Sequence, residues 1–131
     1  MAKIQFKYVI LYVEDVEQSM NFYKNTFEAE IKFITPEKDY GELSTGETSL
    51  SFASVDLASS NVKQGFLSSK AETKPFGIEL GFTTDHVEEL VEKAIKNGAV
   101  LYENIAVKPW GQKTAYIKDP NNYLIEICTS I

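Results

Sequence analysis

The sequence of 131 residues predicts an α+β fold built from two copies of a βαβββ module. Segments with strand-like and helix-like patterns follow one another in the same order in both halves of the chain. Turn and cap residues recur at an offset that drifts from about 70 to about 75 residues, as short loop insertions would produce. A polar stretch separates the halves. These observations place module one at residues 3–55, a linker at 56–75 and module two at 76–131.

Module one opens with an alternating strand at residues 3–13, in which Phe6, Tyr8 and Tyr12 share one face. Both faces are largely apolar, so we expect both to be covered. Asp15 is a candidate helix N-cap, because its carboxylate can accept a backbone N–H that the helix leaves free. Apolar residues at helical spacing follow it: Val16, Met20, Tyr23 and Phe27. Short strands separated by turns complete the module, at residues 29–34, 40–44 and 49–54.

The linker is rich in Ser, Lys, Asn and Thr, and its middle carries only Phe66 and Leu67 as large apolar residues. A structureless loop of this length is uncommon unless it has a function or packs on something. We expect it to lie over its own domain.

Module two repeats the pattern. A strand at 76–84 places Glu79, Gly81 and Thr83 on one face, and Thr84 or Asp85 can cap the next helix. The apolar stripe of that helix consists of Val87, Leu90, Val91, Ala94 and Ile95. Two further strands are predicted at 100–105 and 113–118, with Trp110 in the loop between them.

The chain closes with a tight turn at residues 119–122 and a strand at 123–128. Asp119 and the two asparagines supply side chains that bond nearby backbone, and Pro120 presets φ for the turn. Glu126 interrupts the apolar strand. Because an unpaired buried acid is costly, Glu126 must face water or a polar cavity.

Composition narrows the class of protein. The chain is 44% hydrophobic and 24% charged, as expected of a folded globular domain. No apolar run approaches the ~20 residues that span a bilayer, and the N-terminal residues lack the apolar segment of a signal peptide. A single cysteine, Cys128, rules out an internal disulfide framework and favours the cytoplasm. The net charge of −6, without a basic cluster, argues against nucleic-acid binding.

Two motifs carry a resemblance to a known family. The first runs from Val13 through Asp15 and Ser19 to Phe22-Tyr23, and the second from Trp110-Gly111 through Asp119-Pro120 to Glu126. With the repeated βαβββ order, they resemble the vicinal-oxygen-chelate superfamily, which includes glyoxalase I, extradiol dioxygenases, and fosfomycin- and bleomycin-resistance proteins. The resemblance covers nearly the whole chain. It implies curled mixed β-sheets around a cleft, with the helices outside.

The resemblance also identifies the positions at which metal-dependent members hold a divalent ion. These are Tyr8, Ser51, Glu79 and Glu126. Only the two glutamates are good ligands, and both expected histidines are absent; at most a hard divalent ion would be held by such oxygen ligands. The only histidine, His86, lies at the start of the second helix, where an exposed position is expected. We therefore predict no metal and no other cofactor.

What remains is a cleft with aromatic side chains and acids, which suits a planar or cationic organic ligand. The predicted ligand-binding residues are Phe6, Tyr8, Tyr12, Ser51, Glu79, Trp110, Tyr116 and Glu126. This set resembles the metal-free bleomycin-resistance branch, whose members bind a basic drug in grooves between two subunits. The resemblance implies a homodimer with a small-molecule ligand.

Other interpretations remain open at the level of sequence. The aromatic side chains could fill the cleft themselves, as in many small barrels. Glu79 or Glu126 could act as a general base in a lactoylglutathione-lyase-like or other lyase or isomerase reaction, with or without a divalent metal. The chain could also be a non-catalytic interaction module. Metal content and ligand titration separate these classes.

Overall fold

The structure, a computed structural model, describes residues 2–131 and shows eight strands and three helices in that range. The elements in chain order are β1 (Tyr8–Val13), α1 (Val16–Phe27), β2 (Glu30–Ile34), β3 (Tyr40–Ser44), β4 (Ser49–Ser54), α2 (Val55–Asn61), β5 (Glu79–Thr83), α3 (Val87–Lys96), β6 (Val100–Val107), β7 (Lys113–Lys118) and β8 (Leu124–Cys128). The strands form two mixed four-stranded sheets, ordered β1-β4-β3-β2 and β5-β8-β7-β6. In each sheet the first and last strands of a module run parallel, and all other neighbours are antiparallel. The predicted α+β class with its repeated βαβββ order is confirmed.

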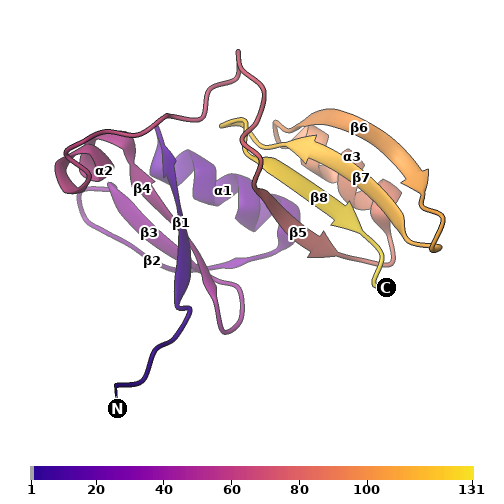
Figure 1. Ribbon diagram of the computed structural model, residues 1–131, viewed down its shortest axis with the longest axis horizontal. Coiled ribbons are helices and arrows are strands. Elements are labelled where there is room, and N and C mark those ends of the chain that lie inside the picture. The colour runs from indigo at the N-terminus through magenta and orange to yellow at the C-terminus, as the bar shows by residue number, and fades with distance from the viewer. Residues whose placement is uncertain (1) are drawn as a thin grey trace. The chain divides into compact units, whose positions relative to one another are not determined.

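The chain divides into two compact units, each built on one sheet (Figure 1). The first unit ends at Ser68, and the second starts at Ser69 and also takes in Asn25–Phe27, the last turn of α1. The segment expected to be a linker is not wholly irregular. It contains α2, which starts where the Ser54 hydroxyl accepts the Leu57 N–H at 3.0 Å. No helix within residues 2–131 is long and apolar enough to cross a membrane.

In the first unit the core lies between α1 and one face of the sheet. Asp15 caps α1 as predicted, and its carboxylate accepts the Gln18 N–H at 3.0 Å. Tyr23 of α1 packs against Phe52 of β4, with ring centroids 5.3 Å apart. The expectation that both faces of β1 are covered is met only in part. Tyr12 packs against Phe66 on the face away from the core, whereas Tyr8 and Ile10 on that face are 45% and 36% exposed.

In the second unit α3 packs on β6, β7 and β8. The helix starts later than predicted, because His86 and not Thr84 or Asp85 occupies the N-cap position. The Thr84 hydroxyl instead accepts the His86 N–H at 3.0 Å, so it stabilises the turn that leads into the helix. The His86 side chain is 72% exposed, as expected.

The turn between β7 and β8 forms as the sequence predicts. One carboxylate oxygen of Asp119 accepts the backbone N–H groups of Asn121 and Tyr123, at 2.8 and 2.9 Å. Asn122 takes a left-handed conformation with φ of 71°. This turn sets the register in which Glu126 lies directly across from Tyr116.

Candidate functional site

The second unit gathers polar side chains on the open face of its sheet. Glu126 of β8 lies across from Tyr116 of β7 on one side and from Gly81 of β5 on the other. Glu79 shares the face of Gly81, because the two are separated by two residues along a strand. The Tyr116 hydroxyl donates to Glu126 Oε2 at 3.0 Å, and the Cys128 thiol lies 3.6 Å from Glu126 Oε1. We call Glu79, Tyr116, Glu126 and Cys128 the second-unit cluster.

In this cluster the pKa values of Glu79, Tyr116 and Cys128 are raised, so each of these groups holds its proton more tightly than usual. Partial burial raises the pKa of Glu79, and the charge of Glu126 raises it further. Burial raises the pKa of Tyr116 to about 12, with a second contribution from its hydrogen bond to Glu126. Burial and the same carboxylate raise the pKa of the Cys128 thiol. Among the described residues neither glutamate has an ion-pair partner, so the cluster presents uncompensated negative charge.

Space is left beside this charge. A Cβ atom added at Gly81 would have no neighbour within 4 Å, so the face between Glu79 and Thr83 is open next to Glu126. A glycine within a strand often marks a place where another group approaches closely. The second unit therefore combines two carboxylates with room for a ligand atom beside them.

Trp110 is connected to the cluster through one amide side chain. Its indole N–H donates to Gln112 Oε1 at 2.9 Å, and Gln112 Nε2 donates to the Thr129 carbonyl at 2.9 Å. The same amide lies near the Cys128 thiol, where it acts to lower the pKa that burial raises. Trp110 is 65% exposed, so its indole N–H is held by Gln112 while most of the residue is open to solvent.

The first unit carries a related set, which we call the first-unit cluster: Tyr8, Tyr40, Glu42 and Ser51. The Tyr40 hydroxyl donates to Glu42 Oε2 at 2.7 Å, and Glu42 lies across from Ser51 in the β3–β4 register. The pKa of Tyr40 is raised to about 12. Burial is the largest cause, the hydrogen bond to Glu42 raises the pKa further, and Tyr8 adds a smaller increase. Ser51 lowers the pKa of Tyr40, although no hydrogen bond of regular geometry joins the two hydroxyl groups.

Tyr40 and Glu42 were not among the residues predicted from the sequence. The signal was available, because Glu42 is an acid within a short strand, which is the same feature that singled out Glu126. Tyr40 is two residues away and therefore on the same face. The structure brings the predicted residues Tyr8 and Ser51 into the neighbourhood of this pair.

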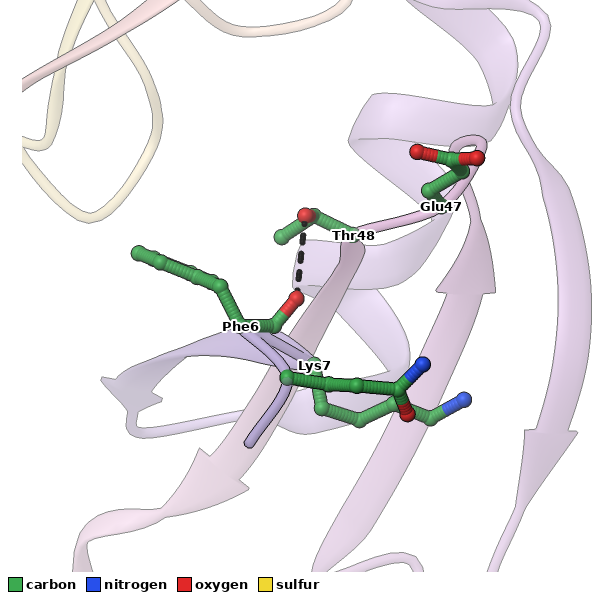
Figure 2. Close-up of a pocket in the computed structure, with 5 residues that line it drawn as sticks. Phe6, Lys7, Glu47 and Thr48 are labelled. Atoms are coloured by element: carbon green, nitrogen blue, oxygen red, sulfur yellow. Dashed lines mark hydrogen bonds between the residues drawn. The ribbon is translucent and has the colours of Figure 1, made fainter. Parts of the chain in front are cut away.

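Two other predicted ligand-binding residues have different surroundings. The Tyr12 ring packs edge-on against Phe66, with centroids 4.7 Å apart, so the segment after α2 lies over its own unit as expected. Phe6 lies before β1, is 74% exposed, and lines a shallow cavity of about 480 Å³ together with Gln5, Lys7, Glu47 and Thr48. Figure 2 shows the Phe6 and Lys7 side chains extending in opposite directions at this cavity, where Thr48 Oγ1 donates to the Phe6 carbonyl at 3.3 Å. This cavity contains none of the carboxylates of the two clusters.

The donor set does not fit a divalent ion. Within residues 2–131 no group of three or more His, Cys, Asp or Glu side chains is placed to hold a metal. Both oxygens of the Glu126 carboxylate already face protons, one from a phenol and one from a thiol. In the first unit the corresponding positions are a phenol and a serine hydroxyl, which are poor ligands when neutral.

The sequence pattern of the Glyoxalase-like domain family matches residues 6–131, almost the entire chain. The chain belongs to this family. This family is part of the vicinal-oxygen-chelate superfamily, so the chain is a member of that superfamily, as the two motifs and the repeated module predict.

Individual relatives agree with this placement. The uncharacterized protein YraH of Bacillus subtilis (strain 168) is 27% identical over 121 residues, which cover 89% of this chain and 91% of YraH. The crystal structure of a glyoxalase-related enzyme from Fulvimarina pelagi superimposes with a TM-score of 0.83 at 21% identity, over 96% of this chain and 88% of that one. A lactoylglutathione lyase from Agrobacterium tumefaciens gives 0.69 at 18% identity, over 98% and 96%. At these identities the two structures show that the fold is shared.

Proposed function

We propose that this glyoxalase-like protein binds a small organic cation, with a planar aromatic part, without a metal ion. The observation that carries the proposal is the second-unit cluster, in which two glutamates on one sheet face have no ion-pair partner within residues 2–131 and lie beside the open space at Gly81. A cationic ligand would relieve the repulsion between Glu79 and Glu126. The exposed Trp110 supplies an aromatic surface for stacking and cation–π contact. A homodimer in the cytoplasm is part of the same proposal.

A titration followed by the fluorescence of Trp110, the only tryptophan, tests this function. The planar cation proflavine is expected to quench the fluorescence with saturation, and the planar anion pyrene-1-sulfonate is not. Glu126→Gln is expected to weaken proflavine binding about tenfold, which corresponds to ~1.4 kcal/mol. Equal binding of the cation and the anion, or no loss in Glu126→Gln, would contradict the proposal.

Two further variants make the test specific. Gly81→Leu places a side chain into the open space without meeting the core, so it is expected to block binding while the circular dichroism spectrum stays unchanged. Glu92→Gln removes an exposed carboxylate from α3 and serves as the matched control for charge. Its affinity for proflavine is expected to equal that of the wild type.

A second candidate is a lyase or isomerase that uses Glu79 as a general base. The likeness in fold to a lactoylglutathione lyase favours it, as does the raised pKa of Glu79, which is the direction a general base requires. Elemental analysis of purified protein and an assay for S-lactoylglutathione formation from methylglyoxal and glutathione test this candidate. Stoichiometric metal and turnover abolished by Glu79→Gln would favour the lyase over the binding protein.

A further inference from the structure

A cavity of about 480 Å³ lies in the first unit, between the segment that precedes β1 and the turn that joins β3 to β4. Its lining consists of Gln5, Phe6, Lys7, Glu47 and Thr48, all of which belong to this unit. The volume falls within the ~300–1,000 Å³ of ordinary small-molecule sites. The cavity is therefore complete within one unit, and it shares no residue with either cluster.

Hydrogen bonds join the two walls of the cavity. The Ser49 N–H donates to the Lys7 carbonyl at 3.0 Å, and the Thr48 hydroxyl donates to the Phe6 carbonyl at 3.3 Å (Figure 2). Directly after these contacts, Tyr8 and Ser49 begin the parallel pairing of β1 with β4. The backbone of the segment before β1 is therefore fixed against the turn.

The turn itself is closed by side-chain hydrogen bonds. The Thr45 hydroxyl donates to the Thr48 carbonyl at 2.7 Å and accepts the Leu50 N–H at 3.0 Å. Gly46 supplies a positive φ of 106°, a conformation that residues with a side chain rarely adopt. Glu47 therefore reaches the cavity from a turn of defined geometry.

The cavity contains one cationic and one anionic side chain that are not paired. Within residues 2–131 neither the Lys7 ammonium nor the Glu47 carboxylate forms an ion pair, so the two charges do not neutralise each other across the cavity. Gln5 adds an amide, which both donates and accepts hydrogen bonds. Figure 2 shows the Phe6 side chain extending away from Lys7, so its ring does not cover the lysine.

We propose that this cavity binds a small aliphatic zwitterion, with its carboxylate at Lys7 and its ammonium group at Glu47. Such a ligand is attracted by both side chains, whereas a singly charged ligand is attracted by one and repelled by the other. The Gln5 amide can bond to either charged group of the ligand. The inference goes beyond the proposed function, because it concerns a second ligand and a site in the other unit.

An NMR titration of the full isotope-labelled chain, at neutral pH and low salt, tests the inference. Three probes share one carbon skeleton: γ-aminobutyrate is the zwitterion, butylammonium the cation and butyrate the anion. The backbone amide signals of Lys7, Glu47 and Thr48 report on the cavity. We expect γ-aminobutyrate to shift these signals and to bind about fivefold more tightly than either singly charged probe, the effect of one exposed ion pair.

Two variants give a crossed result that loss of folding cannot imitate. In Lys7→Met the carboxylate loses its partner, so γ-aminobutyrate should bind no better than butylammonium but still better than butyrate. In Glu47→Gln the ammonium group loses its partner, so γ-aminobutyrate should bind no better than butyrate but still better than butylammonium. Lys24→Met on α1 and Glu37→Gln in the β2–β3 turn replace exposed charges and should behave as the wild type.

The inference is wrong if the wild type binds the three probes equally or binds none of them. It is also wrong if the shifted signals lie outside the cavity, or if each cavity variant behaves as its control. Glu126→Gln, which tests the proposed function, should leave the affinity for γ-aminobutyrate unchanged. Failure of proflavine binding therefore overturns the proposed function alone, and failure of γ-aminobutyrate binding overturns this inference alone.

Discussion

At the scale of single residues, a few side chains are in surroundings that do not favour the folded state. Glu79 and Glu126 interact as like charges, and the hydroxyl of Ser51 is buried without a hydrogen-bond partner in the described part of the chain. Such groups are poor choices for stability, since each lowers the free energy of unfolding. Proteins keep them mainly where a ligand completes the arrangement. All three are at positions that the superfamily resemblance had already marked.

Glu79→Gln is expected to stabilise the protein at neutral pH. The folded-state pKa of Glu79 is above its ordinary value of 4.5, so the native state binds this proton more tightly than the unfolded chain does. The resulting stabilisation is complete below pH 4.5 and is lost as pH rises through the folded-state pKa. Glu79→Gln keeps its stability as pH rises, because the glutamine side chain does not ionise. The gain should stay below ~1 kcal/mol, because Glu79 is largely exposed and water screens its charge.

Thermal unfolding of the wild type and Glu79→Gln at about pH 4 and about pH 7 tests the expected stabilisation. The melting temperature of Glu79→Gln should exceed that of the wild type at neutral pH, and the difference should shrink in acid. Glu92→Gln, an exposed carboxylate on α3, controls for the general loss of negative charge. A constant difference at both pH values would show that titration of Glu79 is not the cause.

At the scale of elements, β3 is held close to α1 by the absence of a side chain. Gly41 lies between Tyr40 and Glu42 in sequence but faces the core, where an added Cβ would overlap the Met20 sulfur and approach the Phe33 carbonyl to 3.1 Å. Strand alternation therefore couples the core face of β3 to the cluster face. A displacement of β3 from α1 would also move Tyr40 and Glu42.

Gly41→Ala is expected to destabilise the protein by about 1–3 kcal/mol, the usual range for overpacking a filled core. Gly81→Ala provides the matched control, since the same added methyl group meets open space and should change stability by less than ~0.5 kcal/mol. Urea denaturation followed by circular dichroism measures both. Equal stability of the two variants would mean that Met20 can move away from Gly41 without loss of packing.

At the scale of the whole molecule, the chain leaves many large apolar side chains exposed. Those above 60% exposure within residues 2–131 include Ile4, Phe6, Leu67, Ile78, Val107 and Trp110. Tyr8 and Ile10 on one face of β1 are also exposed. Exposed apolar groups are normal when scattered, but larger contiguous patches mark interaction surfaces.

We propose a dimer in solution that covers part of this exposed apolar surface. Sedimentation equilibrium should give a mass of about twice that of the chain at micromolar concentration, because burial of apolar surface drives association. Phe6→Ser and Ile78→Ser, each with an intact core, should shift the equilibrium towards monomer. A monomer at all accessible concentrations would contradict the dimer without affecting the family assignment.

Much of the fold was predictable, because its signals are local. The Asp15 cap, the 119–122 turn and strands 40–44, 49–54 and 113–118 each depend on residues that are neighbours in sequence. The helix inside the expected linker was missed, because polar composition masked a Ser54 cap and a turn that buries only Ala58. The predicted start of α3 was too early, because the Thr84 hydroxyl accepts the His86 N–H in the turn before the helix and does not cap the helix itself.

By itself the sequence determined the class of fold, the duplication and the absence of histidine from the family's metal positions, since these follow from residue identity, periodicity and spacing. Only the tertiary structure decided which side chains meet across strands. Register places Glu42 opposite Ser51 and Tyr116 opposite Glu126, and burial raises the pKa values of Tyr40 and Tyr116. Cross-strand pairing joins residues about ten positions apart or more, and neither local propensity nor composition encodes the distance or the dielectric surroundings at which they meet.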